Sequence, residues 1–190
     1  MTRLVTLAAE LQALLDAQAW ENCLIGGLAL QRWGEPRLTT DVDMTVLTGF
    51  GGEEAVVDFL LSRYAGRRAD TRAFALTARV LLLQSPEGIG MDVALGALPF
   101  EERVMHRATR FEFVTGCFLR TCSAEDLVVM KAFADRARDW LDIESVLIRQ
   151  KHGLDWKLIM KELVPLAELK QTPEVSGRLE QLRQKVASLD

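Results

Sequence analysis

The hydrophobic pattern of this chain changes at Ser123, and the change limits the folds that the chain can adopt. Before Ser123, segments with the alternation of β-strands are mixed with segments of helical spacing, whereas every later segment has helical spacing. Ser123 itself can cap a helix, with Asp126 at the matching position of a capping-box variant. The pattern predicts an α+β protein, with a mixed β-sheet flanked by helices over residues 1–122 and a C-terminal helical bundle over residues 123–190.

Individual segments can be assigned from their periodicity and from the Gly and Pro residues that interrupt them. Helical spacing predicts helices at 3–18, 28–33, 53–64, 124–151, 155–170 and 173–188. A break near Asp139 is an alternative for the fourth of these. Strand-type patterns occur at 22–25, 39–47, 79–84, 89–95 and 109–121. The sequence Ser-Pro-Glu-Gly at 85–88 is typical of a turn, so we expect the strands on either side of it to form a hairpin.

Composition and charge exclude several classes of protein. The chain has 190 residues, of which 49% are hydrophobic and 26% charged, and this suits one globular domain or a domain with a helical appendage. A net charge of −4 argues against a protein that coats nucleic acid nonspecifically. The longest apolar run, at 23–30, is far shorter than the about 20 residues of a membrane span. The N-terminal segment resembles an amphipathic helix more than a signal peptide, and the three cysteines lack metal-ligand spacing, so we expect a cytoplasmic protein.

Three aspartates occur in strand-type segments, where Asp is normally rare. Asp41 and Asp43 lie on the same face of the 39–47 segment because side chains alternate along a strand. Two such carboxylates can share a divalent cation; alternatively they form a solvated strand end or pair with Arg37. Asp92 interrupts an apolar strand, where a charge is costly unless it is paired or binds a metal. If these strands are neighbours, three carboxylates meet at one point.

A glycine pair, Gly26-Gly27, stands between a strand-type segment and a helical one. Glycines at such a position let the backbone approach a ligand, and the free amides at a helix N-terminus bind anions such as phosphate. The alternative is a tight turn without a ligand.

Taken in order, these motifs resemble a known family. They are Gly26-Gly27, the segment Arg37 to Asp43, Met91-Asp92-Val93, and the helical segment Asp126 to Ala134. Together they resemble the nucleotidyltransferase fold of the DNA polymerase β superfamily, and within it the AbiEii/AbiGii abortive-infection toxin branch. The resemblance covers residues 23–147. The second glycine of the pair stands where the superfamily usually has serine, so no serine hydroxyl is available to contact a phosphate there.

The resemblance implies a role for each matching residue. Asp41, Asp43 and Asp92 would hold Mg²⁺, as two ions, with Mn²⁺ as an alternative, and Asp92 would also accept the proton of an attacking hydroxyl. The residues that would bind the nucleotide are Gly26, Gly27, Arg37, Thr39 and Lys131. Two alternatives stay open from the residues alone, because Lys131 can pair with Asp135 at i+4 and Arg37 can pair with Asp41.

The activity that the resemblance implies is transfer of a nucleoside monophosphate from an NTP to a hydroxyl, with pyrophosphate leaving. The acceptor would be an RNA 3′ end, a protein side chain or a small molecule. The implied biological role is a toxin that acts on tRNA, with an antitoxin protein as partner. The alternatives are a module of this fold that binds NTP or a partner without turnover, and a structural α+β protein. A basic stretch from Arg63 to Arg79 fits either a solvated helix end or a track for RNA phosphates.

Overall fold

The chain forms two compact units in a computed structural model that describes residues 2–188. Of the described residues, the first unit contains 2–28 and 38–122, and the second contains 29–37 and 123–188. The boundary between them falls within helix α2 (Gly26–Trp33), so the segment 29–37 packs with the second unit although it lies inside the first in sequence.

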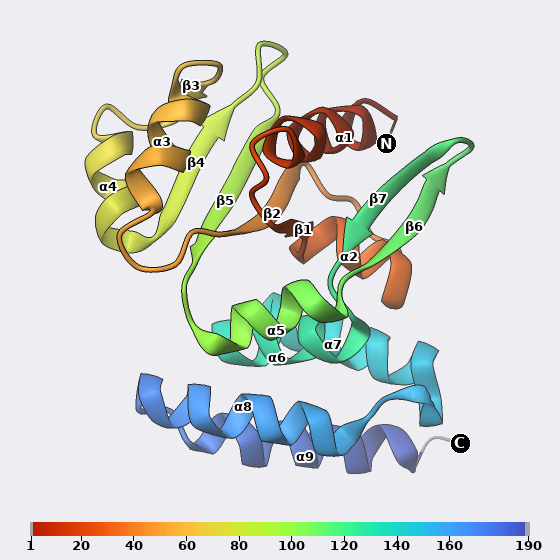
Figure 1. The fold of residues 1–190 in the computed structure, drawn as a ribbon. Coiled ribbons are helices and arrows are strands. Elements are labelled where there is room, and N and C mark those ends of the chain that lie inside the picture. The colour runs from red at the N-terminus through yellow and green to blue at the C-terminus, as the bar shows by residue number, and fades with distance from the viewer. Residues whose placement is uncertain (1, 189–190) are drawn as a thin grey trace. The chain divides into compact units, whose positions relative to one another are not determined.

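The first unit is built on one mixed seven-stranded sheet (Figure 1). Its strands are β1 (Asn22–Leu24), β2 (Asp41–Leu47), β3 (Ala65–Gly66), β4 (Val80–Gln84), β5 (Gly90–Gly96), β6 (Thr109–Val114) and β7 (Cys117–Thr121). They lie in the order β3-β4-β5-β2-β1-β7-β6. The pairs β2–β5 and β1–β7 are parallel and the others antiparallel, with β4 and β5 forming the predicted hairpin. The mixed sheet that the sequence predicts is therefore confirmed.

Alternation along β2 decides which side of the sheet is the core. Val42, Met44 and Val46 are fully buried in one hydrophobic cluster, to which the neighbouring strands and helix α1 (Thr2–Asp16) also contribute. Asp41 and Asp43 have the opposite phase and stay half-buried on the other face. Burial of the apolar face stabilises the sheet, because each fully buried large aliphatic side chain contributes about 1.5–3 kcal/mol.

Two short helices of the first unit were not predicted from sequence. Besides α1 and α3 (Glu53–Leu61), the structure has α4 (Thr71–Ala78) and α5 (Pro99–Arg107). The start of α5 depends on Glu101, whose carboxylate accepts the backbone N–H groups of Ala97 and Leu98 at 2.7 and 2.8 Å. At eight and nine residues these helices are too short for a clear helical period, and contacts within the unit stabilise them.

The second unit is helical beyond Ser123, as predicted. It contains α6 (Ala124–Ala134), α7 (Ala137–Gln150), the 3₁₀ turn η1 (Lys151–Gly153), α8 (Trp156–Lys170) and α9 (Glu174–Ala187). Ser123 caps α6 by accepting the Asp126 N–H at 3.1 Å. The expected 124–151 helix is two helices, because Asp135 takes a left-handed backbone (φ 57°) that ends α6. Helices α8 and α9 pack against each other (Figure 1), and no helix within residues 2–188 is long and apolar enough to span a membrane.

Candidate active site

Strand register brings the three aspartates to one face of the sheet. In the parallel pair β2–β5, Asp43 lies directly beside Asp92, and Asp41 lies beside Gly90. Residues that are register partners in neighbouring strands point to the same face, about 4.8 Å apart at the backbone. Asp41 shares that face because it precedes Asp43 by two residues. The backbone therefore gathers all three carboxylates on the half-buried face of β2 and β5.

The glycine pair packs directly on one of these carboxylates. Gly26 begins α2 with a left-handed backbone (φ 55°), and Gly27 donates its N–H to Asp43 Oδ2 at 3.1 Å. A Cβ at Gly26 would collide with the Asp43 carboxylate, and a Cβ at Gly27 would collide with the side chain of Thr39. The helix therefore starts at Gly26, two residues earlier than predicted, and its first amides lie beside Asp43. Three of the residues expected to bind nucleotide thus adjoin the acidic strand.

Gly26→Ala is expected to destabilise the protein by about 2–4 kcal/mol, because the new Cβ adds a collision to the cost of a left-handed backbone. Gly49→Ala is the matched control. Its φ of 65° is similar, but nothing lies within 4 Å of its Cβ position, so it should cost only about 1 kcal/mol. Urea unfolding of both variants measures the difference. Equal losses would contradict the close packing of Gly26 on Asp43.

Two of the three carboxylates contact donors of the protein. Asp92 forms an ion pair with Arg67, while Asp43 accepts the N–H of Gly27. Within residues 2–188, no three His, Cys, Asp or Glu side chains are gathered closely enough to hold a metal ion. We expected the three carboxylates to meet at one point, and their side chains do not do so in the structure. The physical reason is that Asp92 has the Arg67 guanidinium as its counter-charge while Asp43 accepts the Gly27 amide, so these two carboxylates contact separate donors.

Arg67 is the residue of this site that sequence reasoning missed. It follows the two-residue strand β3, and in the sequence it is one basic residue among several. Its contact with Asp92 depends on the pairing of β3 with β4 and of β4 with β5. No local pattern signals that arrangement, because it involves residues that are 25 positions apart.

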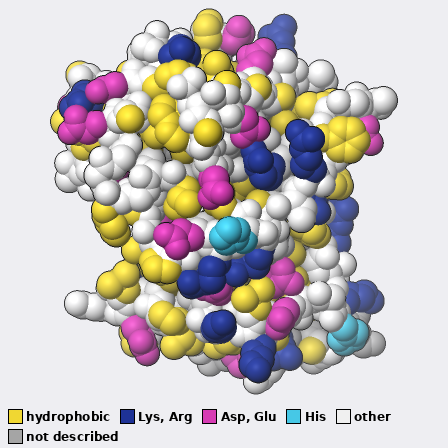
Figure 2. All heavy atoms as spheres, viewed as in Figure 1, with side chains coloured by type: hydrophobic (Ala, Val, Ile, Leu, Met, Phe, Trp, Pro, Cys, Tyr) yellow, Lys and Arg dark blue, Asp and Glu magenta, His cyan; other side chains and the backbone are white. Residues whose placement is uncertain are grey.

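Three other arginines of the basic stretch form ion pairs. Arg68 pairs with Asp70, Arg72 with Glu54 and Asp58, and Arg79 with Glu53. Hydrogen bonds from Arg72 hold the pKa of Asp58 below its usual value. On the face shown in Figure 2, basic side chains likewise lie next to acidic ones. The role of the stretch, as a solvated helix end or as a track for RNA phosphates, stays a prediction.

Arg37 and Lys131, the other two residues expected at the nucleotide, belong to a charged cluster inside the second unit. Arg37 donates two hydrogen bonds to Asp142, at 2.7 and 2.8 Å. Lys131 Nζ donates to Asp142 at 2.7 Å and to Asp139 at 3.1 Å, and its side chain is 7% exposed. Their roles at the nucleotide stay predictions.

The alternative partner that the sequence left open for Lys131 is wrong. Lys131 does not pair with Asp135, because the left-handed backbone of that residue turns its carboxylate to Trp140 Nε1, at 2.6 Å. Arg37 pairs with Asp142, and its alternative pairing with Asp41 stays a prediction. Burial raises the pKa of Asp142, but the hydrogen bonds from Arg37 and Lys131 outweigh burial and hold the pKa below its usual value.

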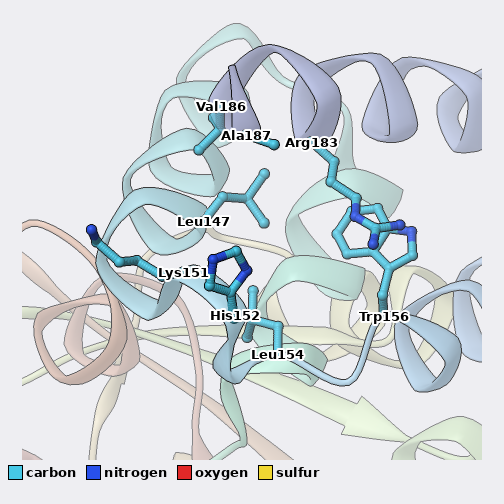
Figure 3. Close-up of a pocket in the computed structure, with 8 residues that line it drawn as sticks. All are labelled: Leu147, Lys151, His152, Leu154, Trp156, Arg183, Val186 and Ala187. Carbon is cyan, nitrogen blue, oxygen red and sulfur yellow. The ribbon is translucent and has the colours of Figure 1, made fainter. Parts of the chain in front are cut away.

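A pocket of about 310 Å³ lies within the second unit (Figure 3). Its lining residues are Leu147, Lys151, His152, Leu154, Trp156, Arg183, Val186 and Ala187. The Arg183 guanidinium stacks over the Trp156 ring at 4.5 Å, and Trp156 Nε1 donates to Glu180 at 2.8 Å. Among residues 2–188, no acidic side chain and none of the predicted site residues lines this pocket.

Several solved structures are similar to this chain. An antigenic nucleotidyltransferase-like protein from Paracoccidioides brasiliensis matches with a TM-score of 0.51 and 22% identity, over 93% of this chain and 92% of that chain. The antibiotic-resistance factor ANT(2'')-Ia in solution has a TM-score of 0.45 and 18% identity, over 99% and 95%. Its crystal structure with adenylyl-2''-tobramycin has a TM-score of 0.45 and 20% identity, over 99% and 98%. At 22% identity, the match to the Paracoccidioides brasiliensis protein supports the fold alone.

Comparison of the sequence with protein-family models identifies the family, which the fold alone does not. The curated proteins contain no match to this sequence. A family model described as nucleotidyl transferase AbiEii toxin, type IV TA system, matches residues 7–187. The match includes strands β2 and β5, which contain the three aspartates, and helix α6, which contains Lys131. Because it spans nearly the whole chain, the protein belongs to the AbiEii family and is a nucleotidyltransferase.

Proposed function

We propose that the protein transfers a nucleoside monophosphate from an NTP to a hydroxyl acceptor, with Mg²⁺ held by Asp41, Asp43 and Asp92. The observation that carries this proposal is the register of β2 and β5, which sets Asp43 beside Asp92 on one sheet face. Three carboxylates on one face are the hard oxygen donors that Mg²⁺ prefers, so the residues fit the ion. When bound, Mg²⁺ would supply positive charge to the reacting phosphate oxygens.

The residues of the chain then have separate tasks in the reaction. The amides of Gly26 and Gly27 begin a helix, and such amides bind phosphate. In the transfer itself, the acceptor oxygen bonds to the α-phosphorus while the bond from that phosphorus to the bridging oxygen breaks, and pyrophosphate leaves. Asp92 is proposed to take the proton of the acceptor hydroxyl, which is the role that the family resemblance implies for it. Lys131 and Arg37 are proposed to bind the β- and γ-phosphates.

The biological role that we propose is that of a toxin in a toxin–antitoxin pair. The family to which the chain belongs is described by that role, and this supports the proposal. We propose the 3′ end of tRNA as the acceptor, in the cytoplasm, where NTP and tRNA occur together, and an antitoxin protein as the partner. A net charge of −4 implies that tRNA is bound through local contacts and not by the overall field of the protein.

An NTP is expected to stabilise the fold only when a divalent metal is present, because the acidic face tolerates the charge of an NTP only through the ion. At ligand concentrations about 100 times the dissociation constant, the melting temperature should rise by about 5 °C. Thermal melts with ATP, GTP, CTP and UTP, each with and without Mg²⁺, measure this. Asp70→Asn, on an exposed residue paired with Arg68, is the control that should keep the shift. No shift with any NTP and Mg²⁺ would overturn the proposal, and a shift without label transfer to RNA would support a binding module.

A further inference from the structure

Arg67 lies in one row with two of the three aspartates. Its backbone N–H donates to Leu82 O at 3.0 Å, directly after the last register pair of β3 and β4. Leu82 is in turn the register partner of Asp92, and Asp92 is that of Asp43. The row therefore runs across four adjacent chain segments. A long side chain on Arg67 can reach over Leu82 to the carboxylate of Asp92, and the structure shows this ion pair.

The guanidinium of Arg67 also lies beside a second carboxylate. A Cβ at Gly90 would be 3.0 Å from Arg67 Nη1 and would collide with the carboxylate of Asp41. The missing side chain of Gly90 thus leaves the space in which Arg67 and Asp41 approach each other. One cation is therefore in place beside two of the three proposed metal ligands.

This position matters because a guanidinium and a metal ion need the same oxygens. Arg67 donates to Asp92 Oδ1, and an oxygen that accepts from a guanidinium has to give up that contact to ligate a metal in its place. Arginine stays charged at all ordinary pH values, so it does not leave by losing a proton. A divalent cation beside an unmoved Arg67 would also be repelled by it. Both groups are partly exposed, at 29% for Arg67 and 36% for Asp92, so the pair can open without unfolding the sheet.

We propose that Arg67 is a built-in competitor of the catalytic metal, holding Asp92 in the metal-free protein and releasing it when the metal enters. This inference rests on the proposed function, because it requires that Asp92 is a metal ligand. Arg67 is a positioning residue in this scheme, since it acts through Asp92. Its removal should therefore tighten metal binding, which is the opposite of what the loss of a supporting contact would do.

The test is the affinity of the nucleotide-free, full-length protein for Mn²⁺, measured by electron paramagnetic resonance of the free ion. Arg67→Gln should lower the dissociation constant by about tenfold, and Arg67→Met, which also removes the charge, should do the same. Arg68→Gln is the matched control. Arg68 is the next residue along the chain and has the same charge as Arg67, but its partner is Asp70, in an exposed pair. Its dissociation constant should stay within about twofold of the original protein. Circular dichroism checks that each variant is folded. If only one of Arg67→Gln and Arg67→Met folds, the Mn²⁺ affinity of that variant decides the outcome.

A double variant shows whether the effect passes through Asp92. Adding Asp92→Asn to Arg67→Gln should remove the gain in Mn²⁺ affinity, because the two residues act on one oxygen. Equal or weaker Mn²⁺ binding by Arg67→Gln, with clear binding by the original protein, would overturn the competitor role alone. The same gain in Arg68→Gln would also overturn it, by showing a general charge effect. If neither the original protein nor Arg67→Gln binds Mn²⁺, the proposed function itself fails, and this inference fails with it.

Discussion

Asp43→Asn is expected to lower nucleotidyl transfer by several orders of magnitude while the protein stays folded. The amide has nearly the shape of the carboxylate. In the original protein the Gly27 N–H donates to Asp43 Oδ2 at 3.1 Å, and the amide oxygen of the variant can still accept this hydrogen bond. What it lacks is the negative charge that holds a divalent ion at the reacting phosphate, and the stabilisation of the transition state depends on that ion. The cost to stability should be no more than about 1 kcal/mol, the usual contribution of a charge at a helix N-terminus.

Transfer is measured with an α-labelled NTP and total bacterial RNA as the acceptor, and stability is measured by a thermal melt of the same preparation. Asp70→Asn is the matched control: it also removes a carboxylate charge, but from an exposed pair with Arg68, so it should keep full activity. An Asp43→Asn protein that is active but melts at a much lower temperature would show that Asp43 is structural. The acidic face would then be wrongly assigned as the active site.

Asp142→Asn is expected to destabilise the second unit by about 3 kcal/mol, because two cations would lose their shared counter-charge in a buried place. The Asp142 side chain is 5% exposed, and it accepts hydrogen bonds from both Arg37 and Lys131. Three of the four tryptophans belong to the second unit, so urea unfolding followed by fluorescence reports mainly on it. Glu144→Gln, on the same helix, is the control, because its pair with Lys185 is exposed on the lysine side and should contribute at most about 1 kcal/mol.

The same cluster makes a prediction about pH. The pKa of Asp142 is lowered in the folded protein, so its contribution to stability is complete above the unfolded value of 3.8 and is lost as the pH falls through the lower folded pKa. The difference in stability between the original protein and Asp142→Asn should therefore be constant near neutral pH and shrink only below about pH 4. A difference that already disappears at pH 6 would contradict the buried ion pairs as its cause.

Much of the fold could be predicted from local patterns. Alternation in 39–47 placed Asp41 and Asp43 opposite the buried Val42 and Met44, and β2 has this arrangement. The turn at 85–88 joins the hairpin β4–β5, and Ser123 caps α6, as the spacing indicated. These features depend on residues that are close in the sequence, so each can be predicted from one short segment of the chain. The aspartates and the glycine pair were selected in the same way, from residues whose chemistry is unusual for their local structure.

The tertiary structure alone decided which charges meet. Arg67 and Asp92 are 25 positions apart, and Arg37 and Asp142 are 105 apart. The attraction between two charges depends on their distance in space and not on their separation in sequence, so the sequence alone does not tell which of the 23 Lys and Arg residues meets which acid. Backbone alternation and capping determine a residue's own conformation, whereas a charge finds its partner through the packing of elements that are distant along the chain. That is why the sequence by itself determined the acidic strand face and the glycine turn, and only the folded chain determined that Arg67 lies against Asp92.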